Sequence, residues 1–347
     1  MTTPHYLGAL LVLLVITGLG LYSGTRVKSA GDFSGGSKKA GAGIVAGSIV
    51  GTIAGGAATI GTAQLAFTFG FSAWWFTLGG GIGFLVLGAF YAKPLYESGI
   101  TTMPQALSRE YGRSVATAAA VLTSISGFLS VVAQVLAGVA IVTSVTDVPS
   151  GAAICIILVM MFAYVLFGGM WGAGIVGIAK TVLVFIAIGG CGVLAVVWQG
   201  GLAAFTLALP AGQFFNLVAR GAAVDLGAGL SLILGVLASQ AYIQAVISAK
   251  TLRFSRIGVF LAATLTPLVG IAGIFVGLYM RLNAPDINPA GALPLFVLHH
   301  LPPLFAGGVL ATLLVVVMGT AAGISLGISS MFCNDIYRAH FKPGATD

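Results

Sequence analysis

Charged residues are scarce in this sequence: Lys, Arg, Asp and Glu together make up 7% of 347 residues, against roughly 25% in a soluble domain. A chain with so little charge has too few polar groups to cover a globular surface in water, and 58% of its residues are hydrophobic. Lipid, in contrast, requires apolar outward faces and tolerates few charges. The composition therefore excludes a water-soluble fold and indicates an integral membrane protein.

Cysteines and acidic residues are too few and too scattered for several classes of function. Cys155, Cys191 and Cys333 have no metal-ligand spacing, and an odd number inside apolar segments argues against a disulfide framework. No carboxylate pair, nucleophile with a neighbouring base, or metal cluster occurs in one place, and His299-His300 is typical of a solvated loop. The basic residues are too dispersed to bind nucleic acid. We therefore expect neither an enzyme nor a nucleic-acid-binding protein.

Long apolar segments are abundant. A helix needs about 20 apolar residues to cross about 30 Å of hydrocarbon. Nine segments satisfy this, near 6–23, 41–69, 73–95, 115–144, 150–169, 172–199, 226–249, 257–281 and 304–334. The fold class that they predict is an all-α membrane protein with about nine transmembrane helices embedded in a lipid bilayer. The short amphiphilic stretch 103–113 is expected to form an interfacial helix on the cytoplasmic side.

The basic residues give the orientation of these segments. If the loops alternate between two sides of the membrane, only Arg220, Arg281 and Lys180 of the 15 Lys and Arg residues fall outside the second side. That side holds Arg26, Lys28, Lys38, Lys39, Lys93, Arg109, Arg113, Lys250, Arg253, Arg256, Arg338 and Lys342. Positively charged loops face the cytoplasm. We therefore expect a multi-pass protein of the plasma (inner) membrane with its N-terminus outside.

The second apolar segment contains a predicted helix break. The chain has 51 glycines, and Gly47, Gly51 and Gly55 lie four residues apart, as in small-residue packing stripes. That packing does not explain the adjacent Gly55-Gly56 at mid-membrane or the polar residues that follow it, which are Thr59, Thr62 and Gln64. An unwound midpoint exposes backbone carbonyls that bind a cation and half-helix ends that face a substrate. We therefore place a candidate binding site here.

Several short sequences follow one another in a definite order along nearly the whole chain. They are Phe67-Thr68-Phe69-Gly70, Gly168-Gly169, Gln240 with Gln244 and Ala249-Lys250, Leu293-Pro294, Met318-Gly319-Thr320 and Asp335-Ile336-Tyr337-Arg338. Their order and spacing resemble the sodium/solute symporter family, which contains bacterial proline and sugar transporters. The family is similar in fold to the leucine transporter, with two inverted five-helix repeats preceded by an extra helix.

The resemblance implies a domain organisation. Residues 1–347 form a single transmembrane transporter domain, in which 6–23 is the extra helix and 41–199 the first repeat. Residues 226–335 are the first three helices of the second repeat, whose last two helices are missing. The chain is thus expected to be either a fragment or a naturally short member.

The resemblance also implies an ion site. In the family, sodium lies between carbonyls at the break of the second span and oxygens of the ninth. Here the carbonyls belong to Ala57 and Ile60, and the ninth-span partners are Val316, Gly319 and Thr320. The family usually has two adjacent hydroxyls at the last two positions, whereas this sequence has Gly319 and Thr320. The sodium site implied here therefore lacks one hydroxyl, and sodium is the only cofactor or metal that we expect.

Fewer of the family's substrate-binding residues have a counterpart in this sequence. Gln64 corresponds to a glutamine that contacts substrate in a sugar-transporting member, and the neighbouring break residues Gly55, Gly56 and Thr59 complete the expected site. Leu232 and Gly235 stand where the family has a sugar-binding Asn and a gating Tyr. The resemblance therefore favours a small polar solute, such as an amino acid or organic acid, over a sugar.

Lys180 is the one ionisable residue inside a predicted span. It lies about 12 Å from the cytoplasmic end at about 1.5 Å per residue, so its stem nearly reaches the interface, and snorkelling is one interpretation. Intramembrane ionisable residues are also functional candidates. Where the family has Asp and Gln on this helix, the sequence has Gly177 and Lys180. In the second interpretation the ammonium occupies or guards the ion site and exchanges a proton in place of sodium, as in proton-coupled relatives of the fold.

These observations favour a cation-coupled secondary active transporter that imports a small polar solute by alternating access. Family resemblance favours sodium as the coupling ion. Two alternatives stay open: a proton-coupled transporter of the same fold that uses Lys180, and a symporter-like membrane sensor domain.

Overall fold

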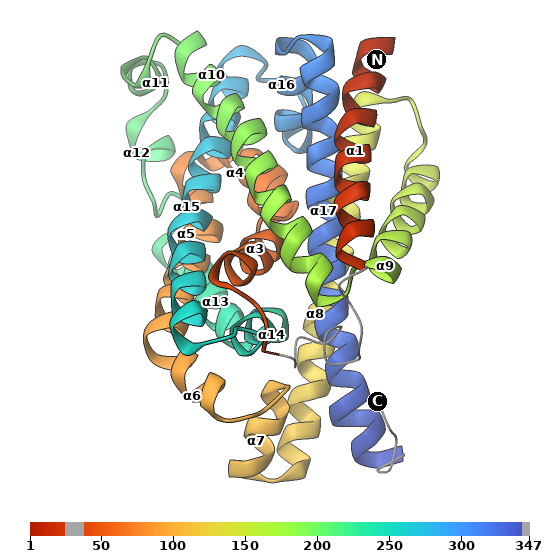
Figure 1. Cartoon of the computed structure of the whole chain (residues 1–347). Coiled ribbons are helices and arrows are strands. Elements are labelled where there is room, and N and C mark those ends of the chain that lie inside the picture. The colour runs from red at the N-terminus through yellow and green to blue at the C-terminus, as the bar shows by residue number, and fades with distance from the viewer. Residues whose placement is uncertain (25–37, 342–347) are drawn as a thin grey trace.

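The computed structural model describes residues 1–24 and 38–341 and is almost entirely helical there (Figure 1). The strand pairing described within these ranges is one isolated parallel bridge between Ala40 and Ala249. The all-α prediction is confirmed for this part of the chain. Some residues of the orientation argument lie outside the described residues, namely Arg26, Lys28 and Lys342.

The helical elements follow the predicted apolar segments closely. In chain order they are α1 (Thr3–Gly24), α3 (Ala42–Ile53), η1 (Ala57–Gly61), α4 (Thr62–Phe69), η2 (Gly70–Trp74), α5 (Trp75–Val86), η3 (Leu87–Tyr91), α6 (Ala92–Glu97), α7 (Met103–Tyr111), α8 (Arg113–Val145), α9 (Ser150–Val184), η4 (Phe185–Gly189), α10 (Gly190–Trp198), α11 (Leu202–Ala208), α12 (Ala211–Phe214), α13 (Ala222–Ala238), α14 (Gln240–Ile247), α15 (Leu252–Asn283), η5 (Pro289–Gly291), α16 (Ala292–His300), α17 (Pro303–Met331) and η6 (Phe332–Phe341).

Six of the described helices, taken with the helical turns that continue them, are long and apolar enough to cross a membrane, and the bent pair α13 and α14 makes a seventh. Ala42–Ile53 and Ser150–Met161 are shorter apolar helices. The count of nine spans therefore stays a prediction. We predicted a boundary near 169–172 between the fifth and sixth spans, but α9 continues as one helix through these residues.

Two helices are interrupted in mid-course. The α3 helix ends at Ile53, the chain leaves helical geometry through Ala54, and helical turns resume in η1 from Ala57. This confirms the break predicted at Gly55-Gly56. The second interruption was not predicted: α13 and α14 meet at Ser239 with a bend of 47°. Broken helices at the starts of both expected repeats are typical of inverted-repeat transporters, in which half-helix ends face the transport site.

Glycines let two helix backbones approach closely. A Cβ built on Gly51 of α3 would lie 2.8 Å from the Cα of Gly177 in α9, and one on Gly47 would lie 2.8 Å from the backbone nitrogen of Ile178. Neither position has room for a side chain, so the contact is backbone against backbone. This crossing places α9, and with it Lys180, against the C-terminal turn of α3.

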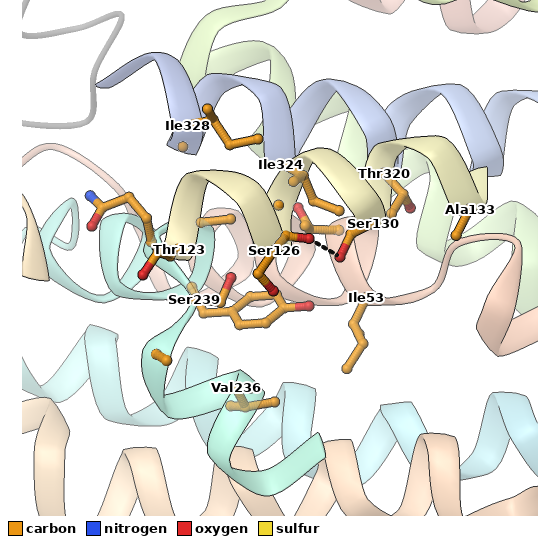
Figure 2. A pocket seen from close by; sticks show the side chains of 18 of the residues that line it. Ile53, Thr123, Ser126, Ser130, Ala133, Val236, Ser239, Thr320, Ile324 and Ile328 are labelled. Carbon is orange, nitrogen blue, oxygen red and sulfur yellow. Dashed lines mark hydrogen bonds between the residues drawn. The ribbon is translucent and has the colours of Figure 1, made fainter. Parts of the chain in front are cut away.

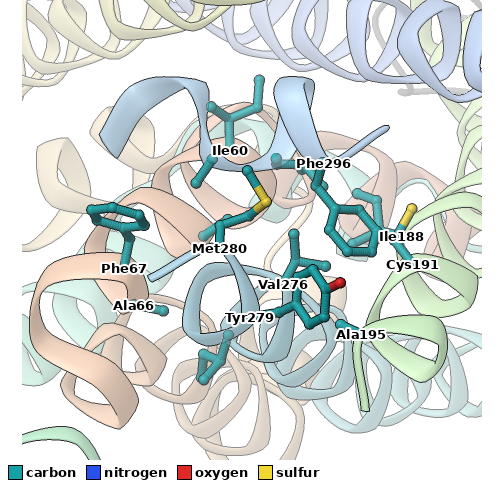
Figure 3. Packing of buried hydrophobic residues seen from close by; sticks show 14 of the residues in the cluster. Ile60, Ala66, Phe67, Ile188, Cys191, Ala195, Val276, Tyr279, Met280 and Phe296 are labelled. Carbon is teal, nitrogen blue, oxygen red and sulfur yellow. The ribbon is translucent and has the colours of Figure 1, made fainter. Parts of the chain in front are cut away.

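The two ends of the helical bundle differ in what lies there. Figure 1 places the N-terminus, α11 and α16 at one end, and α6, α7 and the end of the described chain at the other. A large hydrophobic cluster joins η1, α4, α10, α15, α16 and the first half of α17, and Ile60, Phe67, Met280 and Phe296 meet within it (Figure 3). Which of the two ends faces the cytoplasm stays a prediction from the basic residues.

Candidate functional site

The ammonium of Lys180 lies inside the protein, and its side chain is only 1% exposed. Its Nζ donates to the carbonyl oxygen of Gly51, to the carbonyl oxygen of Val316 at 2.8 Å, and to Oγ1 of Thr320 at 3.0 Å. An ammonium has three N–H donors, so all three are used. The snorkelling interpretation is therefore wrong for this structure: the side chain bridges α9, α3 and α17.

The helix break supplies one of these acceptors. In an unbroken helix the Gly51 carbonyl would accept from the Gly55 N–H, but that N–H turns instead to the Ile53 carbonyl at 2.7 Å. Carbonyls at a helix C-terminus are left without partners and carry a partial negative charge. Oγ1 of Thr320 also lies 3.4 Å from the Gly51 carbonyl oxygen. A cation at this point is thus stabilised by the end of α3 and by α17 together.

The structure brings together part of the expected ion site. Val316 and Thr320 meet Lys180, as expected, but Gly319 is not among the contacts of the ammonium. The Ala57 carbonyl accepts a hydrogen bond from the Thr62 hydroxyl at 3.1 Å. The Ile60 side chain packs in the hydrophobic cluster. The carbonyl that the ammonium binds belongs instead to Gly51, six residues before Ala57, and a backbone acceptor leaves no signal in the sequence.

Hydrogen bonds within the protein occupy the break itself. The Gly56 N–H donates to Oε1 of Gln134 in α8 at 2.7 Å, and the Thr59 hydroxyl donates to the Gly55 carbonyl at 2.8 Å. A Cβ on Gly55 would lie 2.6 Å from Gln134 Oε1 and 2.8 Å from Thr320 Oγ1. The break is therefore packed between α8 and α17, and Gly55, Gly56 and Thr59 do not line the cavity beside it.

That cavity has a volume of about 470 Å³ and lies between α3, α8, α17 and the bend of α13 and α14 (Figure 2). Pockets for small ligands measure about 300–1,000 Å³. Of the residues expected to contact substrate or ion, Leu232, Gly235, Ala57 and Thr320 line it. Gln64 does not, because it is exposed on α4. The cavity thus touches Thr320, which also binds the Lys180 ammonium.

Hydroxyl and amide groups supply the polarity of this cavity. Thr123, Ser126, Ser130 and Gln134 follow one face of α8 at helical spacing, and Figure 2 shows the labelled hydroxyls of this stripe along the cavity wall. Across from them stand Ser239, Gln240 and Tyr242 of the α13 and α14 bend. The sequence reasoning missed this stripe, although the spacing of polar residues within the apolar segment 115–144 carried the signal.

A second polar network closes the end that holds α7. Gln240 donates from Nε2 to the Thr101 carbonyl at 2.9 Å and accepts from the Met103 N–H at 3.1 Å. Nearby, the Thr102 hydroxyl donates to Oδ1 of Asp335 at 2.9 Å. The loop before α7 is thereby held to both α14 and η6. Gln240 and Asp335, two of the motif residues noted in the sequence, therefore anchor this loop.

Within residues 1–24 and 38–341, no three His, Cys, Asp or Glu side chains lie close enough together to hold a metal ion.

Known proteins similar to this chain are transporters. The family model described as "Sodium:solute symporter family" matches residues 33–347. The human high affinity choline transporter 1 is 24% identical over 378 residues, which cover 97% of this chain and 62% of that protein. An uncharacterized symporter of Bacillus subtilis, YwcA, is 26% identical over 97% of this chain and 69% of its own length. The chain thus spans about 62% of the length of the human relative.

A solved structure has the same fold. The substrate-bound outward-open state of a Na+-coupled sialic acid symporter matches with a TM-score of 0.85 at 18% sequence identity, over 99% of this chain and 76% of that chain. At this identity the match shows the fold alone, and it confirms the fold expected from the resemblance. The family match covers far more than half of the sequence, and its members are transporters and not enzymes. The chain belongs to the sodium:solute symporter family.

Proposed function

We propose that this chain is the transport core of a cation-coupled secondary active transporter that imports a small polar solute by alternating access. We propose further that the Lys180 ammonium takes the place of the coupling sodium ion. The observation that carries this proposal is the set of three acceptors, from Gly51, Val316 and Thr320, that surrounds Nζ of Lys180.

The oxygen atoms around Lys180 do not accommodate a sodium ion in addition to the ammonium. Sodium would use the same oxygen atoms that the ammonium already binds, and two like charges at this distance repel strongly in a buried site. A lysine, unlike sodium, remains attached to the protein and changes its charge only by releasing a proton. Protonated, it links α3 to α17 through charge-assisted hydrogen bonds; neutral, it links them weakly. Proton release therefore provides a way to loosen the two helices during transport.

The position of the cavity supports alternating access. It lies among the residues of α8 nearer to α7, in the half of the molecule that the basic residues assign to the cytoplasm. The opposite half contains the hydrophobic cluster of Ile60, Phe67 and Phe296 (Figure 3). Such an arrangement is that of an inward-facing transporter, in which the cavity exchanges solute with the cytoplasm. Rocking of one repeat against the other would open the opposite end.

Sodium coupling is the second candidate, because the family and the sialic acid symporter of the same fold are described as sodium-coupled. In that version Lys180 guards the site and moves away when sodium enters. The sensor alternative receives no support from the relatives above, which are transporters and symporters.

Uptake by proteoliposomes separates these candidates. Vesicles containing the purified chain are placed in solutions of radiolabelled amino acids and organic acids, under an imposed proton gradient or an imposed sodium gradient. We expect uptake driven by the proton gradient and unchanged when sodium is replaced by potassium. Lys180→Ala is expected to lose the proton-driven uptake. Uptake that depends strictly on the sodium gradient, and is unchanged in Lys180→Ala, would contradict the role of Lys180.

A further inference from the structure

Gln134 joins the helix break to the cavity. Its Oε1 accepts the Gly56 N–H at 2.7 Å, and its side chain is only 6% exposed. The donor fixes the orientation of the carboxamide, because an N–H requires the oxygen and not the nitrogen of the amide opposite it. The Nε2 group is thereby directed away from Gly56, and Gln134 is also one of the residues that line the cavity.

The Nε2 group of Gln134 carries two N–H donors that are available to a ligand. Within the described part of the chain, Gln134 makes its hydrogen bond through Oε1, and none is recorded for Nε2. The hydroxyls of Ser126, which is exposed, and Ser239, which is half-buried, line the same cavity, and no acceptor for either is seen among the described residues. Of the three, Gln134 alone is buried, and a buried polar group is normally paired with protein, water or ligand. These groups therefore form a set of hydrogen-bonding positions that a solute in the cavity can use.

Charge is missing from the same wall. Among the described residues, those that line the cavity include no Asp, Glu, Lys, Arg or His. The nearby Lys180 ammonium adds no free donor, since its three N–H groups are used by Gly51, Val316 and Thr320. A solute with net charge would lose its hydration in this cavity without meeting an opposite charge, which is costly inside a membrane protein.

We infer that the cavity selects a solute of zero net charge, either uncharged or zwitterionic, and that Gln134 Nε2 donates to an acceptor oxygen of that solute. This inference rests on the proposed function, because it assigns the solute of the same transporter. Gln134 is then the residue that sets the charge preference: its neutral amide is tied to the helix break, and an ionised side chain at this place would recruit a solute of opposite charge.

The test uses three amino acids of similar length with different net charge: L-glutamine (zero), L-glutamate (negative) and L-ornithine (positive). Each is added to the purified full chain, and binding is measured as the rise in thermal unfolding temperature followed by tryptophan fluorescence. We expect glutamine to stabilise the protein more than either charged amino acid. Equal or greater stabilisation by glutamate or ornithine, or none by glutamine, would overturn the inference.

Variants at Gln134 test its part directly. Gln134→Glu is expected to shift the preference toward ornithine, and Gln134→Arg toward glutamate, each by about tenfold in relative affinity. Ser126→Asp, on the same face of α8, repeats the first shift if the Gln134 variants do not fold. Gln213→Glu and Gln213→Arg, at an exposed position of α12, are the matched controls and should leave the preference unchanged. Preferences that stay the same in the Gln134 and Ser126 variants would contradict the assignment.

Because binding is measured on the purified protein in detergent and not in vesicles, this test does not depend on transport activity. Selective binding of glutamine without any uptake in vesicles would count against the proposed function alone. Uptake of a charged amino acid, together with its tighter binding, would count against the charge selection while leaving transport intact.

Discussion

One buried ion pair shows how much the surroundings of a single residue matter here. Asp225, at the start of α13, is fully buried and accepts hydrogen bonds at Oδ1 from the Ser72 hydroxyl and from Nε of Arg220, both at 2.7 Å. Its Oδ2 accepts from the Arg220 backbone N–H at 3.0 Å. Because Ser72 belongs to η2, the carboxylate joins the turn after α4 to the start of α13. The pairing of Asp225 with Arg220, five residues earlier, was not predicted from the sequence.

Asp225→Asn is expected to destabilise the protein by about 2–3 kcal/mol. Removing one partner of a fully buried pair costs about 3–5 kcal/mol, and the cost is smaller here because the Arg220 side chain is 19% exposed. Thermal unfolding of the purified variant measures the effect. Asp147→Asn, in an exposed loop, is the control and should unfold like the unchanged protein. An Asp225→Asn protein as stable as this control would show that the pair contributes little.

At the scale of elements, the contact between α3 and α9 determines where Lys180 lies. Gly47 and Gly51 on α3 face Gly177 and Ile178 on α9, and a Cβ on Gly177 would overlap the carbonyl group of Gly47. Gly177, where the family resemblance implies an Asp, has no room for any side chain in this structure. The close crossing at Gly177 brings Lys180, three residues further along α9, within reach of the Gly51 carbonyl.

Gly177→Ala is expected to push α3 and α9 apart, destabilising the protein by about 1–3 kcal/mol through overpacking. It should also reduce proton-driven uptake, since Lys180 then reaches the Gly51 carbonyl poorly. The matched control is Gly190→Ala, where a Cβ would meet nothing within 4 Å. Unfolding temperature and uptake are measured for both variants. Equal behaviour of the two alanine variants would refute the close crossing.

For the whole molecule, the hydrophobic cluster and the cavity occupy opposite halves, so solvent is expected to reach the transport site from one side only. Ser130 lines the cavity, whereas Ala63 lies in the hydrophobic cluster with no exposed surface. The three native cysteines can be replaced without breaking a disulfide, because none of them forms one. The labelling of cysteines introduced at these two positions therefore shows from which side of the membrane water reaches the cavity.

Ser130→Cys, in a background without native cysteines, should react with a membrane-impermeant maleimide added to the cytoplasmic side of vesicles. It should react far more slowly with the reagent added outside, because the hydrophobic cluster lies between. Ala63→Cys is the control and is expected to remain unlabelled from either side. Mass spectrometry of the labelled protein gives both rates. Faster labelling of Ser130→Cys from outside would reverse the orientation proposed here.

The fold was largely predictable from sequence because lipid imposes strong constraints on composition and length. Apolar segments and the distribution of basic residues each have one main physical cause, so the helices were expected where they occur. The break at Gly55-Gly56 was expected because polar residues follow that glycine pair inside the apolar segment. Ser239 was not, because a single serine in an apolar run is also compatible with an unbroken helix. The expected boundary near 169–172 differed for the opposite reason, since adjacent glycines permit helical turns as well as loops.

The candidate site was predicted only in part. Lys180 was singled out because a charge inside an apolar segment is conspicuous, whereas Val316 and Thr320 were expected from the family resemblance. Gly51 and Gln134 were missed: the first acts through its carbonyl, which every residue possesses, and the second through a contact with Gly56 that depends on how α8 packs. Gln64 was expected at the substrate, but the turns of η1 and α4 leave it exposed.

The central claim is that the Lys180 ammonium holds the place of a sodium ion. The most direct measurement is the unfolding temperature of the purified chain in sodium chloride and in potassium chloride at equal ionic strength. An occupied site cannot bind sodium, so we predict the same unfolding temperature in both salts. Lys180→Ala, which exposes the oxygens of Gly51, Val316 and Thr320, should become more stable in sodium than in potassium. Sodium-specific stabilisation of the unchanged protein would contradict the account.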